Sequence, residues 1–210
     1  MRDPLREAWD EARWALGLGD DRVALEDLVR RYEEPHRAYH GTSHVDACLG
    51  VLDAHRGEAE RIGEVTFALL YHDAVYDPTR ADNEAASAAL AADVLRSSGA
   101  DEAAIGRIAS MILATVGHDA ETSDAKLLVD VDLSILGADE VTFEAFERAI
   151  AREYAFVPTA SFRPARRRVL ERFLARESIY RTPSLHAELE VRARTNLARR
   201  IAELGRDQGV

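Results

Sequence analysis

The chain has 210 residues, of which 47% are hydrophobic and 31% charged, as in an ordinary globular protein. Its formal net charge of −11 argues against binding to nucleic-acid polymers, whose phosphates attract basic surfaces, but not against a small phosphorylated substrate. With a single cysteine, no apparent membrane-spanning segment and no apparent signal peptide, we expect a cytoplasmic protein that does not enter a membrane.

Helical periodicity dominates the chain, and no segment shows the alternating pattern of a half-buried strand. In chain order, the predicted helices cover about residues 5–17, 23–32, 44–55, 65–71, 82–97, 101–116, 126–136, 143–156, 161–175 and 185–204. The fourth is nearly all apolar, and although so short a run could be a strand, its helical surroundings favour a buried central helix. We therefore predict an all-α protein.

Two histidines lie at the start of the third predicted helix, in the run Tyr39-His40-x-x-x-His44. Gly41 and Ser43 place the helix start between them, and Ser43 can cap the helix. His44 then lies on the helix, fixed for a metal, and His40 lies in the preceding loop, where it can donate a proton. The alternative is that both are ordinary histidines near a surface turn.

Polar residues also interrupt two apolar segments. His72 and Asp73 end the most apolar predicted helix, which is either a functional position or simply where that helix leaves the core. Asp132 follows the apolar residues 127–129, and an aspartate in such a setting needs a partner, such as a metal, an arginine or a helix N-terminus. Asp130 competes with Asp132 but points in another direction from the same helix, and we choose Asp132.

Imidazole and carboxylate groups together suit a divalent metal in a mixed nitrogen and oxygen site, which can make a bound water acidic enough to attack at neutral pH. An octahedral site with positions left open favours Mn, Fe, Co, Mg or Ni, and Zn is also allowed. These residue types therefore indicate a metal-dependent hydrolase.

The ordered set His44, His72-Asp73 and Asp132 resembles the signature of the HD-domain superfamily of metal-dependent phosphohydrolases. The run from Tyr39 to His44 is similar to the Tyr-His-Asn-x-x-His motif of mammalian cyclic-nucleotide phosphodiesterases, in which the first histidine is the general acid and the second a metal ligand. More narrowly, about residues 30–200 resemble a bacterial family of predicted HD phosphohydrolases without a settled substrate. The segments that carry this resemblance include Tyr71-His72-Asp73-Ala74-Val75-Tyr76-Asp77-Pro78, Asn83-Glu84-x-x-Ser87 and Val131-Asp132-Leu133-Ser134-Ile135-Leu136-Gly137.

The length of the chain predicts a single domain over residues 1–210, or at most a domain with a small helical extension. The resemblance implies that it is an HD-type helical bundle, with a metal-site core at about 36–137 and C-terminal helices at about 139–206. It implies hydrolysis of a small phosphorylated molecule, such as a nucleotide, with a divalent metal ion as cofactor. The implied metal ligands are His44, His72, Asp73 and Asp132, and the implied catalytic residues are His40 and Asp73.

Departures from the superfamily pattern limit what it implies about the substrate. Many HD hydrolases have a phosphate-contacting lysine soon after the His-Asp pair, where this chain has Ala74, Val75 and Tyr76. Gly41 replaces the asparagine of the phosphodiesterase motif, and the following spacing to His72 is shorter than in those enzymes. Cyclic-nucleotide specificity is therefore not inferred.

Further residues are candidates for supporting roles. His118 could add a ligand for a second metal or be a solvent-exposed histidine, and Cys48 is read as core. Arginine and lysine suit oxyanion binding, although the arginines near residue 166 are also typical of a solvated helix face. The candidate substrate contacts are Lys126, Arg152 and Arg166. Asn83 and Glu84 are candidates for supporting the site from outside the metal ligands, for example by orienting His72.

Two other functions stay open at the level of sequence. A second iron, completed by His118 or another residue, would give a di-iron oxygenase of the HD type. A non-catalytic nucleotide-binding or scaffold protein is the alternative outside enzymes, but it need not retain all four predicted ligands. The oligomeric state is left open.

Overall fold

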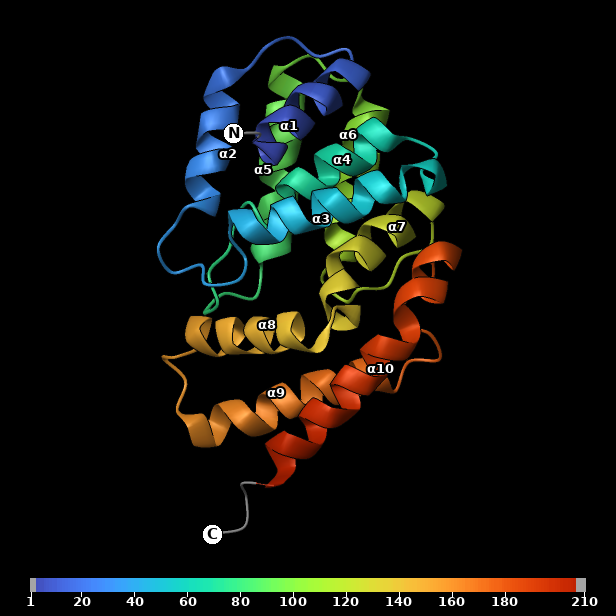
Figure 1. Cartoon of the computed structure of the whole chain (residues 1–210). Coiled ribbons are helices and arrows are strands. Elements are labelled where there is room, and N and C mark those ends of the chain that lie inside the picture. Colours follow the sequence, from blue (N-terminus) through green and yellow to red (C-terminus); the bar gives the residue numbers. More distant parts are fainter. Residues whose placement is uncertain (1–2, 207–210) are drawn as a thin grey trace. The chain divides into compact units, whose positions relative to one another are not determined.

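The computed structural model describes residues 3–206, and within that range the chain consists of helices joined by turns and loops, without a strand (Figure 1). The predicted all-α class is thus confirmed. The chain divides into two compact units, Met1–Asp132 and Leu133–Val210. The expected single domain over residues 1–210 stays a prediction. Among the described residues, no helix has both the length and the apolar character needed to cross a bilayer.

The first unit begins several of its helices with an aspartate. The Asp21 carboxylate accepts a hydrogen bond from the Ala24 amide at 2.9 Å, and Asp101 does the same for Ala104 at 3.0 Å. Such carboxylates satisfy amides that lack a partner in the first turn and oppose the positive end of the helix dipole. The elements of this unit are α1 (Pro4–Ala15), α2 (Arg22–Tyr32), α3 (Thr42–Ala54), η1 (Arg56–Glu58), α4 (Ile62–Tyr71), α5 (Asn83–Ser97), α6 (Glu102–Ala114) and α7 (Ser123–Asp132).

Helix α4 is the centre of the first unit and contacts α1, α3, α5, α6 and α7. Every residue from Glu64 to Tyr71 is buried, which confirms the prediction of a central buried helix. A Cβ atom on Gly63 would lie 2.5 Å from the Cβ atom of Ala15, so the glycine permits the close approach of α1 and α4. Because His72 directly follows α4, this packing carries its imidazole into the interior.

The start of α3 differs in detail from the prediction. Gly41 is the N-cap residue and no side chain caps the helix, so the predicted Ser43 cap is wrong. A Cβ atom on Gly41 would lie 3.1 Å from the Tyr32 carbonyl oxygen, and this tight packing favours glycine at the cap. The predicted separation of the histidines is confirmed, because His40 precedes the helix and His44 lies in its first turn.

The second unit comprises η2 (Leu133–Gly137), α8 (Glu140–Glu153), α9 (Thr159–Leu174) and α10 (Pro183–Arg206). The helix predicted over 126–136 is therefore two elements, since α7 ends at Asp132 and a 3-10 helix follows. The buried carboxylate of Glu147 on α8 accepts hydrogen bonds from Arg166 on α9 at 3.1 Å and from Arg200 on α10 at 3.0 Å. One buried charge thus joins three helices, with both arginines as its partners.

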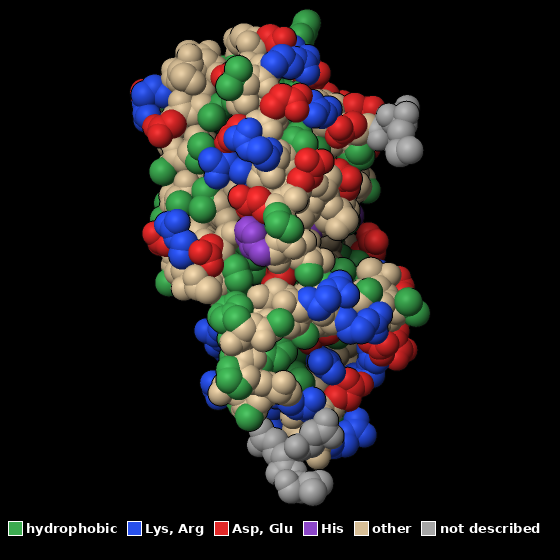
Figure 2. All heavy atoms as spheres, turned by 90° about the vertical axis from the view of Figure 1, so that its left-hand side faces the viewer, with side chains coloured by type: hydrophobic (Ala, Val, Ile, Leu, Met, Phe, Trp, Pro, Cys, Tyr) green, Lys and Arg blue, Asp and Glu red, His purple; other side chains and the backbone are tan. Residues whose placement is uncertain are grey.

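The surface carries charges of both signs. Figure 2 shows acidic and basic side chains interspersed over one face, with hydrophobic side chains in small groups between them. Some of these charges form ion pairs, such as Arg6 with Glu26 at 2.9 Å and Arg199 with Glu140 at 2.7 Å. Exposed pairs of this kind contribute about 0–1 kcal/mol each, so they do not determine the fold.

Candidate metal centre

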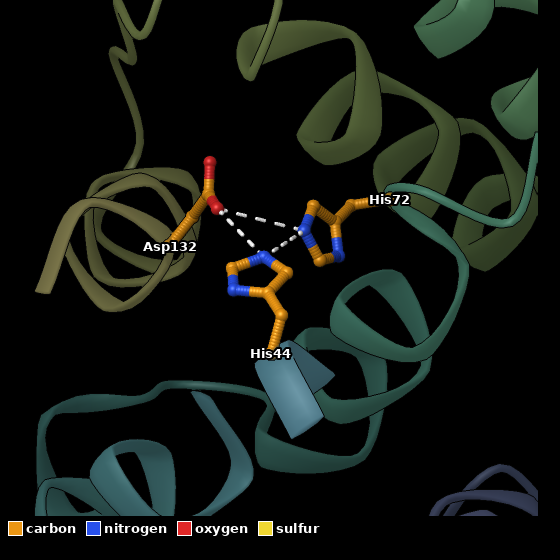
Figure 3. A group of neighbouring side chains, drawn as sticks. All are labelled: His44, His72 and Asp132. Carbon is orange, nitrogen blue, oxygen red and sulfur yellow. Dashed lines mark hydrogen bonds and ion pairs between the residues drawn. The ribbon is translucent and has the colours of Figure 1, made fainter. Parts of the chain in front are cut away.

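Three side chains from different elements of the first unit converge on one point. His44 comes from the first turn of α3, His72 from the residue after α4, and Asp132 from the end of α7. Figure 3 shows the two imidazole rings and the carboxylate pointing toward one another, with one carboxylate oxygen directed at both rings. Both histidines are buried and Asp132 is nearly so, so the three groups face one another within the packed unit.

The distances between the donor atoms fit a single metal ion. Nε2 of His44 lies 3.2 Å from Nε2 of His72 and 3.2 Å from Oδ1 of Asp132, and the His72–Asp132 distance is 3.5 Å. Two donors that each lie about 2.1 Å from one ion are about 3.0 Å apart at a right angle and about 3.4 Å apart at the tetrahedral angle. The buried group of His44, His72 and Asp132 could therefore hold a metal ion.

Asp73, the fourth predicted ligand, lies beside this group. Its Oδ2 atom is 3.2 Å from Nε2 of His72 and 3.7 Å from Nε2 of His44. The carboxylate is close enough to join the coordination of an ion or to accept a hydrogen bond from a water bound there. Its role as a ligand or as a catalytic group stays a prediction.

The pKa values of the site reflect its mutual charges. Burial lowers the pKa of His72, but the carboxylates of Asp73 and Asp132 raise it more, so the net pKa lies well above its usual value. Burial raises the pKa of both carboxyl groups, but the surrounding histidines lower it more, so both remain ionised at neutral pH. In the metal-free protein a proton on His72 therefore offsets part of the buried negative charge.

The two histidines are held by different outer partners. Nδ1 of His72 lies 2.7 Å from the Leu69 carbonyl oxygen, which fixes Nδ1 as the protonated nitrogen and leaves Nε2 to face the site. The Cys48 sulfur lies 3.6 Å from Nδ1 and 3.9 Å from Nε2 of His44. The sulfur thus packs against the His44 imidazole. Cys48 is buried, which confirms its predicted place in the core. Burial also raises the pKa of its thiol, which disfavours the thiolate that a nucleophile needs.

His40, the candidate general acid, lies next to the cluster. Its ring centroid is 5.9 Å from that of His44 and 4.3 Å from that of Tyr76, with which it stacks. Its charge is also among the causes that lower the pKa of Asp73. The side chain is partly exposed, as a group that exchanges protons with a substrate must be.

His118 is close to the cluster through the second oxygen of Asp132. Its Nε2 atom lies 3.2 Å from Oδ2 of Asp132, while Oδ1 of the same carboxylate faces His44 and His72. The φ angle of His118 is 50°, in the left-handed region that few residues other than glycine adopt, and such strain gathers at functional sites. The alternative of a fully solvent-exposed histidine does not describe this position.

Asn83, one of the two residues predicted to support the site from outside, holds the loop after α4 rather than His72 itself. Asn83 accepts a hydrogen bond from the Asp77 amide at 3.1 Å and donates one to the Asp77 carbonyl oxygen at 2.9 Å. The prediction that it orients His72 is wrong, because the Leu69 carbonyl fills that place. Glu84 lies in the first turn of α5, and its supporting role stays a prediction.

The predicted substrate contacts are spread over both units. Lys126 lies six residues before Asp132 on α7, about 9 Å back along the axis and on another side of the helix. Arg152 is exposed near the end of α8. Arg166 on α9 is paired with Glu147 and stacks over the Phe146 ring at 5.2 Å, so its guanidinium already has partners. Binding of substrate by these three residues stays a prediction.

Sequence reasoning missed Arg37 and Ser87, which hold the loop after α4. Ser87 accepts a hydrogen bond from the Val75 amide at 3.0 Å, and Arg37 donates to the carbonyl oxygens of Asp73 and Ala74 at 2.6 and 3.1 Å. Ser87 could have been found from its place in the motif shared with Asn83, but an arginine before a histidine pair carries no signal of its own.

Comparison with known proteins adds no assignment. No protein-family model matches the chain, and neither a curated protein nor a solved structure matches it. The functional interpretation therefore rests on the residues of the site, on the distances among His44, His72 and Asp132, and on the groups next to them.

Proposed function

We propose that the chain is a metal-dependent phosphohydrolase that acts on a small phosphorylated molecule, with a nucleotide as one candidate. The observation that carries the proposal is the buried convergence of His44, His72 and Asp132, with Asp73 beside them and His40 at the edge. The likeness of these residues to the HD-domain signature supports the same activity.

A divalent ion held by this group would supply Lewis acidity, which lowers the pKa of water and offsets charge on a phosphoryl group. Mn, Fe, Co, Mg and Ni suit the imidazole and carboxylate donors, and Zn is also compatible with them. The protein's part is to hold the donors in place, and the Leu69 carbonyl does so for His72 at 2.7 Å.

His40 completes the proposed mechanism as the proton donor to the leaving oxygen. It precedes α3, is partly exposed, and its ring contacts that of His44 with centroids 5.9 Å apart. The charge of His40 is among the causes that lower the pKa of Asp73, so the two groups lie close enough to interact electrostatically. The position of His40 suits a general acid that protonates the leaving oxygen.

A screen of nucleotides and phosphomonoesters against Mn, Co, Mg and Ni tests the proposal. We expect protein purified without chelator to contain or take up about one divalent ion, and to hydrolyse at least one of these substrates only when loaded. Removal of the metal with a chelator should abolish turnover, and readdition should restore it. Protein that takes up no metal on titration would exclude the proposed function.

Metal binding is also expected to release protons, about one for each ion bound near neutral pH. Protons are released rather than taken up because the raised pKa of His72 keeps it protonated in the metal-free protein, whereas a ligand nitrogen must be unprotonated. Asp73 and Asp132 have lowered pKa values and contribute no proton. Apparent affinity should therefore fall as pH falls.

Calorimetric titration of metal in two buffers of different ionisation enthalpy measures this proton release. Replacement of the exposed histidine His186 by alanine provides a control and should leave the number of protons unchanged. Equal heats in the two buffers would mean that the cluster is unprotonated before the metal binds.

Oxygen chemistry at two irons is the second candidate function. It is favoured by the Asp132 carboxylate, whose Oδ2 atom contacts His118 while Oδ1 faces the other two histidines. His118 and Asp132 would then help to hold the second ion, and His44 and His72 the first. Two irons per chain in protein purified with excess iron, together with no hydrolysis of any phosphate ester, would favour this alternative.

A further inference from the structure

We infer that Arg37 is a positioning residue that fixes His40 relative to Asp73. Its guanidinium joins the loop that carries the proposed proton donor to the loop that carries the carboxylate beside the metal group. The inference rests on the proposed function for its kinetic consequences, but the structural link itself can be tested separately.

The hydrogen bonds of Arg37 define this link. Its NH1 group donates to the carbonyl oxygen of His40 at 2.9 Å and to that of Asp73 at 2.6 Å, and NH2 donates to that of Ala74 at 3.1 Å. Nε donates to the Glu34 carboxylate at 3.0 Å, which balances the charge. Four of the five N–H donors are thus used, three of them on the backbone of the two loops.

The surroundings of Arg37 show that this arrangement is built into the fold. Its side chain is fully buried, which is rare for arginine and requires that its donors be satisfied. The guanidinium carbon lies 5.3 Å from the Tyr32 ring centroid and 5.5 Å from that of Tyr76. Lysine could not reproduce this geometry, because its single ammonium group cannot span two loops as a planar fork does.

The loop after α4 has no regular structure of its own, so side chains hold it. Ser87 holds Val75, Asn83 holds Asp77, and Arg37 holds the segment nearest the metal group. Ser87 and Asn83 both belong to α5, which follows this loop in the sequence. Arg37 comes earlier in the chain, three residues before His40. Of these three side chains, Arg37 is the one that also holds the backbone of the proton donor.

The ring of Tyr76 adds a second contact between the same two loops. It stacks on His40 with centroids 4.3 Å apart, and Arg37 lies close to the same ring. The backbone of His40 is thus held by the guanidinium and its ring by Tyr76. Loss of Arg37 should let His40 move away from the substrate without removing any of the nitrogen ligands, and a misplacement of about 1 Å can cost about 100-fold in rate.

The test uses the full-length chain with Arg37→Ala, followed by rescue with guanidinium ion well below denaturing concentrations. We expect the metal content to be kept, and hydrolysis of an alkyl phosphate to fall about 100-fold. A nitrophenyl phosphate should lose much less, because its leaving group needs little protonation. Guanidinium should restore several-fold of the lost rate, whereas the same concentration of methylammonium or sodium chloride should not.

A second readout does not require activity. In the metal-free protein, hydrogen exchange at the Val75 and Asp77 amides should be faster in Arg37→Ala and slow again with guanidinium. Arg30→Ala provides a matched control, because Arg30 is an exposed arginine of the preceding helix and should change neither exchange nor rate. If the wild-type chain hydrolyses no substrate, the proposed function fails, but the exchange result still decides the link.

Two results would overturn the inference. One is wild-type exchange and rate in Arg37→Ala. The other is an equal loss on both substrates without rescue, which would mean a general structural role. If Arg37→Ala does not fold, Arg37→Lys takes its place. That variant should then lose rate selectively on the alkyl phosphate, and a wild-type rate and wild-type exchange would count against the link.

Discussion

Replacement of both His72 and Asp73 by alanine is expected to abolish metal binding and hydrolysis together. Nε2 of His72 lies within 3.5 Å of the donor atoms of His44 and Asp132, and Asp73 supplies the adjacent carboxylate. Loss of an outer partner of a metal site typically costs about 10–100-fold, and loss of two inner groups should cost more. Metal content by elemental analysis and turnover under saturating metal measure the two effects.

The controls separate loss of the site from loss of the fold. Circular dichroism and thermal unfolding should show that the double variant is folded. The metal-free wild-type protein is the reference for this comparison, because its site also holds no ion. Ala at His186, an exposed histidine of the second unit, should keep both metal and activity. Turnover that survives in the double variant would place the reaction at another site.

The all-α fold class could be predicted in part because one segment is apolar on every side, as a helix at the centre of a helical protein must be. The run from Val65 to Tyr71 has no polar side chain except Thr66, and the structure buries all of it at the centre of the first unit. Helix ends were less predictable, because caps depend on contacts far away in sequence. Ser43 is a good cap by type, yet the closeness of the Tyr32 carbonyl to Gly41 decides where α3 begins.

Part of the candidate site could be predicted because a charged residue stands in a segment that is otherwise apolar and therefore buried. Asp132 ends an apolar helix, and the structure places its carboxylate against two histidines, whereas Asp130 is buried but is not in that group. Such a residue is visible in sequence, because a buried carboxylate needs a partner. Their separation of two residues on one helix means that both aspartates cannot face the histidines, but it does not decide which one does.

The supporting residues were not predictable because they act on the backbone. Arg37 and Asn83 bind carbonyl and amide groups of the loop after α4, and the sequence of that loop does not show which groups lack partners. The role assigned to Asn83 failed for this reason. A carbonyl within α4 already satisfies His72, which left Asn83 to hold Asp77.

Replacement of His40 by alanine is expected to keep the metal and lose about 10²–10⁴ in rate, the usual share of general acid catalysis. His40 precedes α3 and its ring centroid lies 5.9 Å from that of His44, so it is near the metal group without being one of the three residues that could hold the ion. The loss should be large for alkyl phosphates and small for nitrophenyl phosphates. Turnover of both substrates by metal-loaded protein measures this difference.

His44→Ala is the matched comparison for His40→Ala, because it removes a nitrogen donor four residues away and should lose metal and rate together on both substrates. His36→Ala removes an exposed histidine of the same loop and should leave metal content unchanged. Equal loss of metal in the His40 and His44 variants would make His40 a ligand. An unchanged rate of His40→Ala on an alkyl phosphate would return His40 to the alternative of an ordinary histidine in a surface turn, and the proton would then have to come from another group.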